Sequence, residues 1–183
     1  MDECGVKINT GQSAYGHSQG GVRCVEIGRY IAGPNHTLNF IVGLNASMFA
    51  SVIPGPSNAN QFVIFFTEAT EAFTVDGEPV LTPGDTVVVD NAPIHHHEAE
   101  RLLFNLLDDF GIELVYLPTY SPDFNPAENC FNKLKITLKR DYYRELLHDN
   151  LPIAVYDALS EITPHDTWEF FNATGYLNMN PNL

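Results

Sequence analysis

The stretch TVVVDNAPIHHHEAERLLFNLLDDFGIELVYL, residues 86–117, carries the clearest fold signal in this chain. It opens with a short apolar run that ends at Asp90, which is typical of a strand buried on both faces of a sheet. One helical face then collects the apolar residues Ala99, Leu102, Leu103, Leu106, Leu107 and Phe110. Gly111 ends that helix, and residues 112–117 form the next strand. This order of strand, helix and strand predicts a parallel crossover in an α/β sheet.

The residues before this stretch favour antiparallel strands followed by a helix. Residues 22–31 and 36–53 mix β-branched and aromatic side chains with Gly and Asn, as strands and their turns do. Residues 59–73 are predicted to be helical. Segments 54–60 and 76–85, rich in Pro, Gly, Ser and Asp, are predicted to be loops within one domain.

After the second strand, a long helix is predicted from Asn125-Pro126 to about His148, because Pro is tolerated in a first helical turn. Its core stripe consists of Phe131, Leu134, Leu138 and Tyr142. Glu128 lies beside that stripe, close to Lys135 and Lys139 in angle. A second group of cations, Lys133, Arg140 and Arg144, points to another side of the helix.

The composition limits the classes of function. A chain of 183 residues corresponds to about one domain with a substantial core. Nine Lys plus Arg against 23 Asp plus Glu give a net charge of −14, which opposes nonspecific attraction to nucleic acid or anionic lipid. No apolar run approaches the length of a membrane span, so no membrane partner is expected. The three separated cysteines encode neither a disulfide framework nor a zinc ribbon.

Three acidic positions are candidates for chemistry: Asp2, Asp90 and Glu128. Reactive groups gather beyond the carboxyl ends of parallel strands, where Asp90 lies. Taken alone, Asp90 is better explained as a turn or helix cap, and Glu128 as a response to the helix dipole. The run of three histidines at 95–97 does not predict a metal site, because consecutive helical residues point about 100° apart.

Two longer motifs favour a catalytic role for these acidic residues over the capping and dipole explanations. They are VVVDNAPIH at residues 87–95 and IELVYLPTYSPDFNPAENCFNKLK at residues 112–135, with 37 residues between Asp90 and Glu128. With the acidic start at Asp2, the segment to about Arg140 resembles the catalytic domain of mariner-like transposases. These belong to the DDE endonuclease group, which is related to bacterial insertion-sequence transposases and retroviral integrases.

The resemblance implies a ribonuclease H-like α/β fold, with a mixed sheet flanked by helices. The first strand is expected to be truncated, because only Met1 precedes Asp2. We expect a single catalytic domain over residues 1–183, with the motifs in residues 2–140 and a helical extension over residues 141–183. The helix-turn-helix module that family members carry upstream is not expected in this chain.

The resemblance also implies the site residues. Asp2, Asp90 and Glu128 would be the catalytic carboxylates and would hold two Mg²⁺ or Mn²⁺ ions, with Glu3 as the alternative to Asp2. Supporting roles fall to Asn91, His95 and Asn129. The expected nucleic-acid-binding residues are Lys133, Lys135, Lys139 and Arg140.

The expected function is metal-dependent cleavage of DNA phosphodiester bonds and strand transfer, with DNA and, as an option, a second copy of the chain as partners. It would take place in the nucleus of a eukaryote, and otherwise in the cytoplasm or nucleoid. The alternative is a domesticated or decayed domain without catalysis that serves as a protein-interaction module, which the acidic surface favours. An unrelated phosphohydrolase is disfavoured, because no Gly-rich phosphate loop or nucleophile elbow is present.

Overall fold

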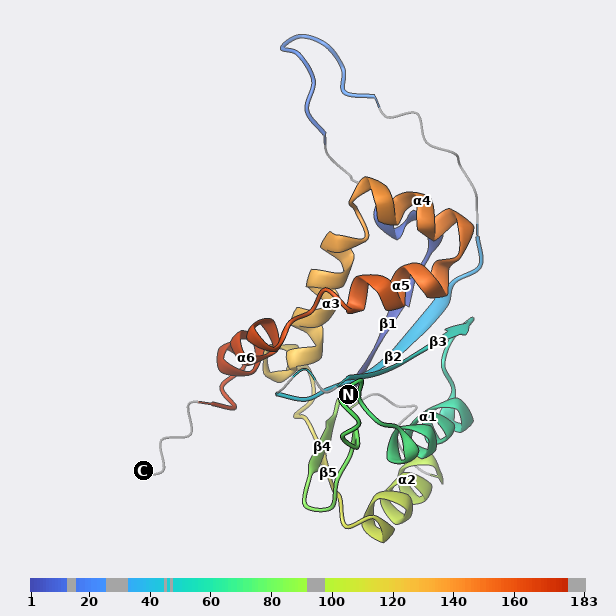
Figure 1. Cartoon of the computed structure of the whole chain (residues 1–183), viewed down its shortest axis with the longest axis vertical. Helices are drawn as coiled ribbons and strands as arrows, with labels where there is room; N and C mark the ends of the chain where they lie inside the picture. The colour runs from blue at the N-terminus through green and yellow to red at the C-terminus, as the bar shows by residue number, and fades with distance from the viewer. Residues whose placement is uncertain (13–15, 26–32, 45, 47, 92–97, 178–183) are drawn as a thin grey trace.

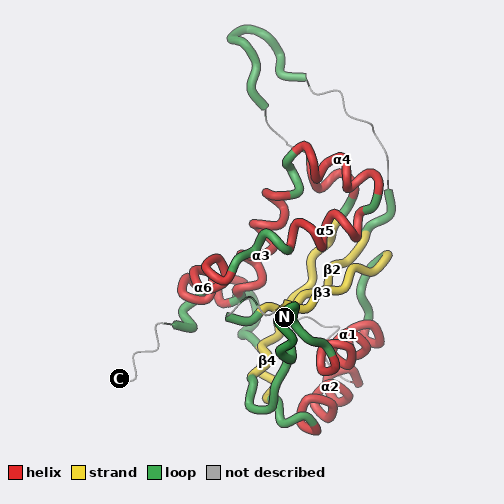
Figure 2. The backbone as a smooth tube through the Cα atoms, viewed as in Figure 1, coloured by secondary structure: helices red, strands yellow, loops and turns green. Residues whose placement is uncertain are grey.

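The computed structural model describes residues 1–12, 16–25, 33–44, 46, 48–91 and 98–177. The N-terminal half contains β1 (Asp2–Val6), the 3-10 turn η1 (Ile8–Gly11), β2 (His36–Val42), β3 (Met48–Pro54), α1 (Ala59–Glu71) and β4 (Thr86–Val89). The C-terminal half contains α2 (Glu98–Asp109), β5 (Glu113–Tyr116), the 3-10 turn η3 (Pro122–Phe124), α3 (Pro126–Thr137), α4 (Asp141–Asp149), α5 (Leu151–Leu159) and α6 (Pro164–Ala173). Figures 1 and 2 show their arrangement.

The strands form an antiparallel part and a parallel part. In the first, β2 pairs with β1 and β3, with Asp2 opposite Phe40 and Phe40 opposite Ala50. In the second, β4 and β5 pair in parallel, as the sequence predicts. The main-chain nitrogen of Met1 donates a 2.7 Å hydrogen bond to the carbonyl of Val88, which joins the start of β1 to β4. The strands therefore form a three-stranded sheet in the order β1-β2-β3 and a two-stranded sheet, β4-β5, which lies next to the start of β1.

Helices cover both faces of the antiparallel strands (Figure 1). Leu38 and Phe40 of β2 pack in one core with α3, α4 and α5. Ile41 packs in a second core with α1, α2 and β4. Because successive strand residues point to opposite faces, β2 is buried on both sides and is a central strand. Asp2 lies on the strand next to it.

The crossover from β4 to β5 confirms the prediction from residues 86–117, with a narrower buried face on α2. Leu103 and Leu107 are fully buried, whereas Leu102 and Phe110 are each about two-fifths exposed, at 41% and 42%. Leu106, which is half-buried, packs with Leu103 and Leu107 against the same core, so α2 contacts α1 and β4 through these three leucines. Gly111 ends the helix with a φ of 70°, a conformation that glycine adopts without steric cost.

The predicted single helix from Asn125 to His148 is wrong, because two helices, α3 and α4, occupy this segment. The chain turns between them: the amides of Lys139 and Arg140 bond three residues back, and Arg140 is extended at ψ 145°. The turn shifts the helical phase by one residue. Tyr142 is consequently 62% exposed, and Tyr143, at 5%, continues the buried stripe.

The η1 turn accounts for the position of this corner. A Cβ at Gly11 would lie 2.5 Å from the carbonyl oxygen of Leu138, so only glycine permits this close approach. Leu138 itself is fully buried. Packing between η1 and the corner therefore outweighs the helical propensity of residues 138–140, which the sequence pattern alone cannot show.

Other predictions for the N-terminal half have mixed outcomes. The antiparallel pair within 36–53 and the helix from Ala59 are confirmed as β2, β3 and α1. The predicted strand at 22–31 is wrong for residues 22–25, which form no strand, and its other residues lie outside those described. Among the described residues, no helix has the length and apolarity needed to cross a membrane.

Candidate functional site

Asp2 is a buried carboxylate at the start of β1. It is only 8% exposed, although aspartate is rarely buried without partners. The amide of Glu3 donates to its Oδ1 at 2.7 Å, and the side chain of Asn125 donates from Nδ2 to its Oδ2 at 3.0 Å. Each carboxylate oxygen therefore has a donor that fixes its direction.

Glu128 lies in the first turn of α3, and Asn125 caps this helix. The Asn125 Oδ1 accepts a hydrogen bond from the amide of Ala127, and its carbonyl accepts one from the amide of Glu128 at 3.2 Å. Pro126 occupies the first helical position, where its missing N–H costs nothing. The sequence Asn-Pro-Ala-Glu thus starts the helix and places Glu128 in its first turn, three residues after the Asn125 that bonds Asp2.

Asp90 follows the last residue of β4, at the carboxyl end of this parallel strand. The hydrogen bond from Met1 to Val88 places the start of β1 next to this end. Three carboxylates from separate parts of the sequence, on β1, after β4 and on α3, therefore lie in one region, close enough for Asp90 and Glu128 to influence Asp2 electrostatically.

The pKa of Asp2 reflects this proximity. Burial is the main cause that raises it to about 7; the hydrogen bond from Glu3 opposes the rise, and the charges of Asp90 and Glu128 add to it. Glu3, the alternative to Asp2, is next in the strand and therefore points to the opposite face. Within the described ranges, however, no three His, Cys, Asp or Glu side chains already enclose a point where a metal ion would fit.

Of the three residues predicted to support the site, the structure describes two. Asn91 and Asn129 are both half-buried, beside Asp90 and Glu128 in the sequence. His95 lies outside the described residues, as do His96 and His97. Asn125 is the residue that the sequence reasoning missed, although an Asn before Pro at a helix start is a recognisable capping signal.

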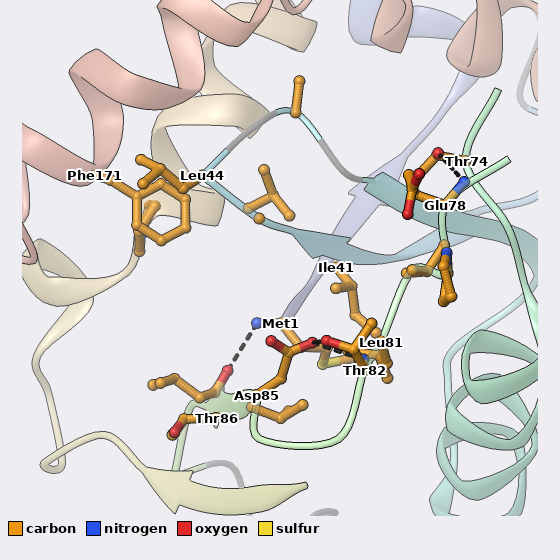
Figure 3. A pocket seen from close by; sticks show the side chains of 18 of the residues that line it. Met1, Ile41, Leu44, Thr74, Glu78, Leu81, Thr82, Asp85, Thr86 and Phe171 are labelled. Atoms are coloured by element: carbon orange, nitrogen blue, oxygen red, sulfur yellow. Dashed lines mark hydrogen bonds between the residues drawn. The ribbon is translucent and has the colours of Figure 1, made fainter. Parts of the chain in front are cut away.

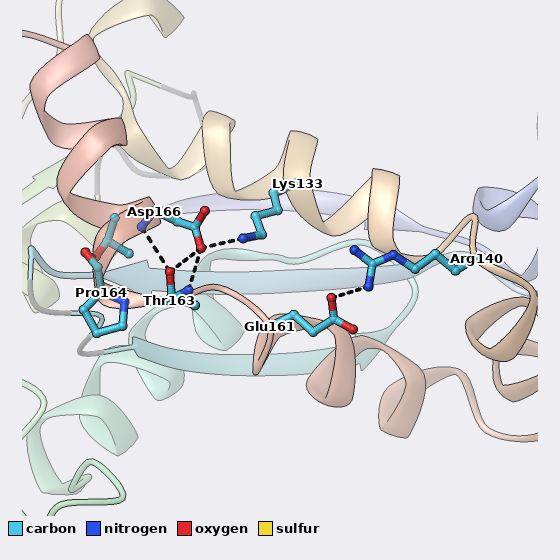
Figure 4. Close-up of polar contacts among 7 residues, drawn as sticks. Lys133, Arg140, Glu161, Thr163, Pro164 and Asp166 are labelled. Carbon is cyan, nitrogen blue, oxygen red and sulfur yellow. Dashed lines mark hydrogen bonds and ion pairs between the residues drawn. The ribbon is translucent and has the colours of Figure 1, made fainter.

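Two of the four predicted nucleic-acid-binding cations have carboxylate partners on the C-terminal segment (Figure 4). Lys133 pairs with Asp166 on α6, and Arg140 pairs with Glu161 after α5. Lys135 is half-buried beside the Cys4 thiol. Lys139 is exposed, and no ion pair of it is seen in the part of the chain that the structure describes.

A cavity of about 890 Å³ lies beside the carboxylates, between β2, β4, the 74–86 loop and the start of α3 (Figure 3). Met1 and Asn125 contribute to its wall, as do Ile41 and Leu44. Asp85 accepts hydrogen bonds from Thr82 within the loop. Asp2, Asp90 and Glu128 do not line this cavity, so in the described structure it adjoins the acidic site without containing it.

Comparison with protein families identifies the class. Residues 1–147 match the model of the DDE superfamily endonucleases. This chain therefore belongs to the DDE superfamily endonuclease family. The match includes Asp2, Asp90 and Glu128. Comparison with curated proteins gives no significant match.

Solved structures show the fold. The Mos1 strand transfer complex is similar with a TM-score of 0.70 at 15% identity, covering 96% of this chain and 51% of that chain. The Mos1 mariner paired end complex with Mn gives 0.66 at 14% identity, covering 96% and 52%. The Mos1 transposase paired-end complex with left transposon end gives 0.64 at 15% identity, covering 96% and 51%. This chain spans about half the length of these relatives, and their likeness confirms the ribonuclease H-like α/β fold.

Proposed function

We propose that this chain is a transposase-type catalytic domain that cleaves DNA phosphodiester bonds and transfers strands with the help of divalent metal ions. The observation that carries the proposal is the proximity of Asp90 and Glu128 to the buried Asp2 in a chain of the DDE endonuclease family. Similar structures are transposase complexes, one with a transposon end and one with Mn.

The donor set fits a hard divalent cation. Carboxylate oxygens are the ligands that Mg²⁺ and Mn²⁺ prefer. The pKa of the buried Asp2 is raised to about 7, first by burial and also by its acidic neighbours, so a cation would relieve the repulsion among them. Asp2, Asp90 and Glu128 would hold the Mg²⁺ or Mn²⁺, and two such ions are expected.

The residues of this chain would then bind and orient the reacting groups. The chemistry that divalent ions would supply there is activation of the attacking water or 3′ hydroxyl and stabilisation of the departing oxygen. Asp2 is held by the amides of Glu3 and Asn125, so its carboxylate does not need to reorganise. Glu128 lies in the first turn of α3, whose cap, Asn125, also bonds Asp2 on β1.

The proposal also covers partners and location. DNA is the substrate, with phosphate contacts from Lys135 and Lys139 and, once their ion pairs open, from Lys133 and Arg140. A second copy of the chain is the other partner we propose, because one DNA end is joined to another site in strand transfer. DNA restricts the place of action to the nucleus of a eukaryotic host, or to the cytoplasm or nucleoid of a bacterium.

The proposal is tested by nicking of supercoiled plasmid with Mn²⁺ or Mg²⁺. We expect nicking by the wild-type chain and its loss in Asp90→Asn and Glu128→Gln, because each change removes a carboxylate ligand without changing side-chain volume. Glu68→Gln, an exposed change on α1, is the matched control and should keep wild-type nicking. Thermal unfolding of all four proteins verifies that they are folded.

The proposal would be wrong if a folded wild-type chain nicked DNA no faster than Asp90→Asn at any concentration of either metal. Equal loss in Glu68→Gln would show that the measured nicking depends on overall charge and has no connection with the three carboxylates.

A further inference from the structure

Asn125 connects the two elements that carry Asp2 and Glu128. Its side chain is a cap for α3 through Oδ1, which accepts from the amide of Ala127 at 3.1 Å. The other end of the same planar amide donates from Nδ2 to Asp2 Oδ2 at 3.0 Å. Asn125 is 5% exposed, so water does not compete freely for either bond.

These contacts orient the Asp2 carboxylate. An ionised carboxylate has about two lone-pair sites on each oxygen. The amide of Glu3 uses one site on Oδ1, and Asn125 uses one on Oδ2. One donor is a backbone amide, and the other is a side chain held in place by its own bond to the start of α3. The remaining lone-pair sites of Asp2 therefore point in fixed directions, toward which a cation can bind. A carboxylate without the second donor could turn about its χ2 angle.

The choice of asparagine follows from this double task. Ser, Thr and Asp also cap helices well, so capping alone does not require Asn. Aspartate would place a second carboxylate against Asp2, which repels it. Serine and threonine accept the cap bond, but their hydroxyl lacks the second arm that reaches β1 while the first is engaged. Asparagine has a donor and an acceptor at opposite ends of one rigid group.

We propose that Asn125 is a positioning residue, which holds the Asp2 carboxylate in the orientation that binds the divalent ion and fixes the start of the Glu128 helix against β1. This inference rests on the proposed metal site. Residues that hold a metal ligand from behind commonly change metal affinity by 10–100-fold when they are replaced.

The test uses Mn²⁺ titrations of the whole chain, followed by thermal unfolding, on Asn125→Ser and Asn125→Ala. Serine keeps the cap and loses the bridge to Asp2, whereas alanine loses both. We expect both variants to need about tenfold more Mn²⁺ for half-maximal stabilisation. In the metal-free state, both variants should lose the stability of the buried bond to Asp2, and Asn125→Ala should show the larger fall in Tm because it also loses the cap. Asn58→Ser at the cap of α1, far from Asp2 in the sequence, is the matched control and should keep the wild-type Mn²⁺ dependence.

The outcomes separate the two proposals. Wild-type stabilisation by Mn²⁺ together with an unchanged Mn²⁺ dependence in Asn125→Ser would overturn the positioning role and leave the metal site intact. A wild-type chain that Mn²⁺ does not stabilise would overturn the metal site itself, and the positioning role with it. A tenfold shift in Asn125→Ser that is absent from Asn58→Ser supports the inference.

Discussion

Asp166 shows how a single residue is tuned by its neighbours. Its Oδ2 accepts hydrogen bonds from the amide of Thr163 at 2.8 Å, from the Thr163 hydroxyl at 2.6 Å, and from Lys133. Burial raises the pKa of Asp166, but the bonds from Lys133 and Thr163 outweigh it and bring the pKa from 3.8 to about 2. One carboxylate thus joins the start of α6 to α3.

This depressed pKa predicts an acid-sensitive contribution to stability. Because the native pKa lies below the unfolded value of 3.8, the contribution is present above about pH 4 and is lost as the pH falls toward 2. The side chain is 23% exposed, so we expect a loss of only about 1 kcal/mol. Urea unfolding of wild type and Asp166→Asn from pH 2 to 6 measures it. A wild-type stability that changes over this range no more than that of Asp166→Asn would contradict the assignment.

At the scale of the elements, the corner between α3 and α4 changes which residues are buried. A continuous helix would place Tyr142 on the stripe of Phe131, Leu134 and Leu138. The turn at 138–140 instead brings Tyr143 into the core, where its hydroxyl donates to Glu161 Oε1 at 2.8 Å. The same turn lets Arg140 reach Glu161, so α3, α4 and the segment after α5 meet at one place.

The corner predicts that alanine substitutions at two neighbouring tyrosines lower the free energy of unfolding by very different amounts. Tyr143→Ala should lower the free energy of unfolding by about 3–5 kcal/mol, because it opens a cavity in a buried site and leaves Glu161 without this donor. Tyr142→Ala should cost less than about 1 kcal/mol, because its ring is mostly exposed. Urea unfolding of both variants decides between a bent and a straight helix. A larger cost for Tyr142→Ala than for Tyr143→Ala would favour one continuous helix.

At the scale of the whole molecule, the charge of −14 opposes the proposed binding of DNA. Part of this opposition is local, since Asp166 and Glu161 pair with Lys133 and Arg140, two of the predicted phosphate contacts. Residues 161–166 therefore affect the electrostatics of α3 and of the corner that follows it. DNA must replace these carboxylates before both cations can reach phosphate.

This competition predicts that Asp166→Asn with Glu161→Gln strengthens DNA binding. The double variant changes the net charge from −14 to −12 and releases two cations. We expect the slope of log K against log salt, measured without divalent ions, to steepen by about 2, because each new phosphate contact adds about 0.9. Glu68→Gln with Glu71→Gln makes the same charge change on the exposed face of α1 and serves as the control. Equal slopes in the two double variants would exclude Lys133 and Arg140 as phosphate contacts.

Much of the fold follows from local patterns. The alternation and the apolar runs predict β2, β3, β4, β5, α1 and α2, because these elements bury one face or both and their side chains must repeat with the period of the backbone. The α3–α4 corner does not follow from such a pattern. Residues 138–140 have no Pro or Gly to stop a helix, and the close approach of Gly11 to Leu138 becomes visible only when η1 is packed against them.

The candidate site divides in the same way. The sequence predicts Asp2, Asp90 and Glu128 as its carboxylates, because they lie in motifs that resemble those of the family whose model matches residues 1–147. Only the tertiary structure shows that Asn125 reaches Asp2 across 123 positions of sequence, and that Asp166 and Glu161 hold Lys133 and Arg140. Sequence patterns show which residues share a face within one helix or strand. Contacts between elements far apart in the sequence depend on how those elements pack together, which these patterns do not encode.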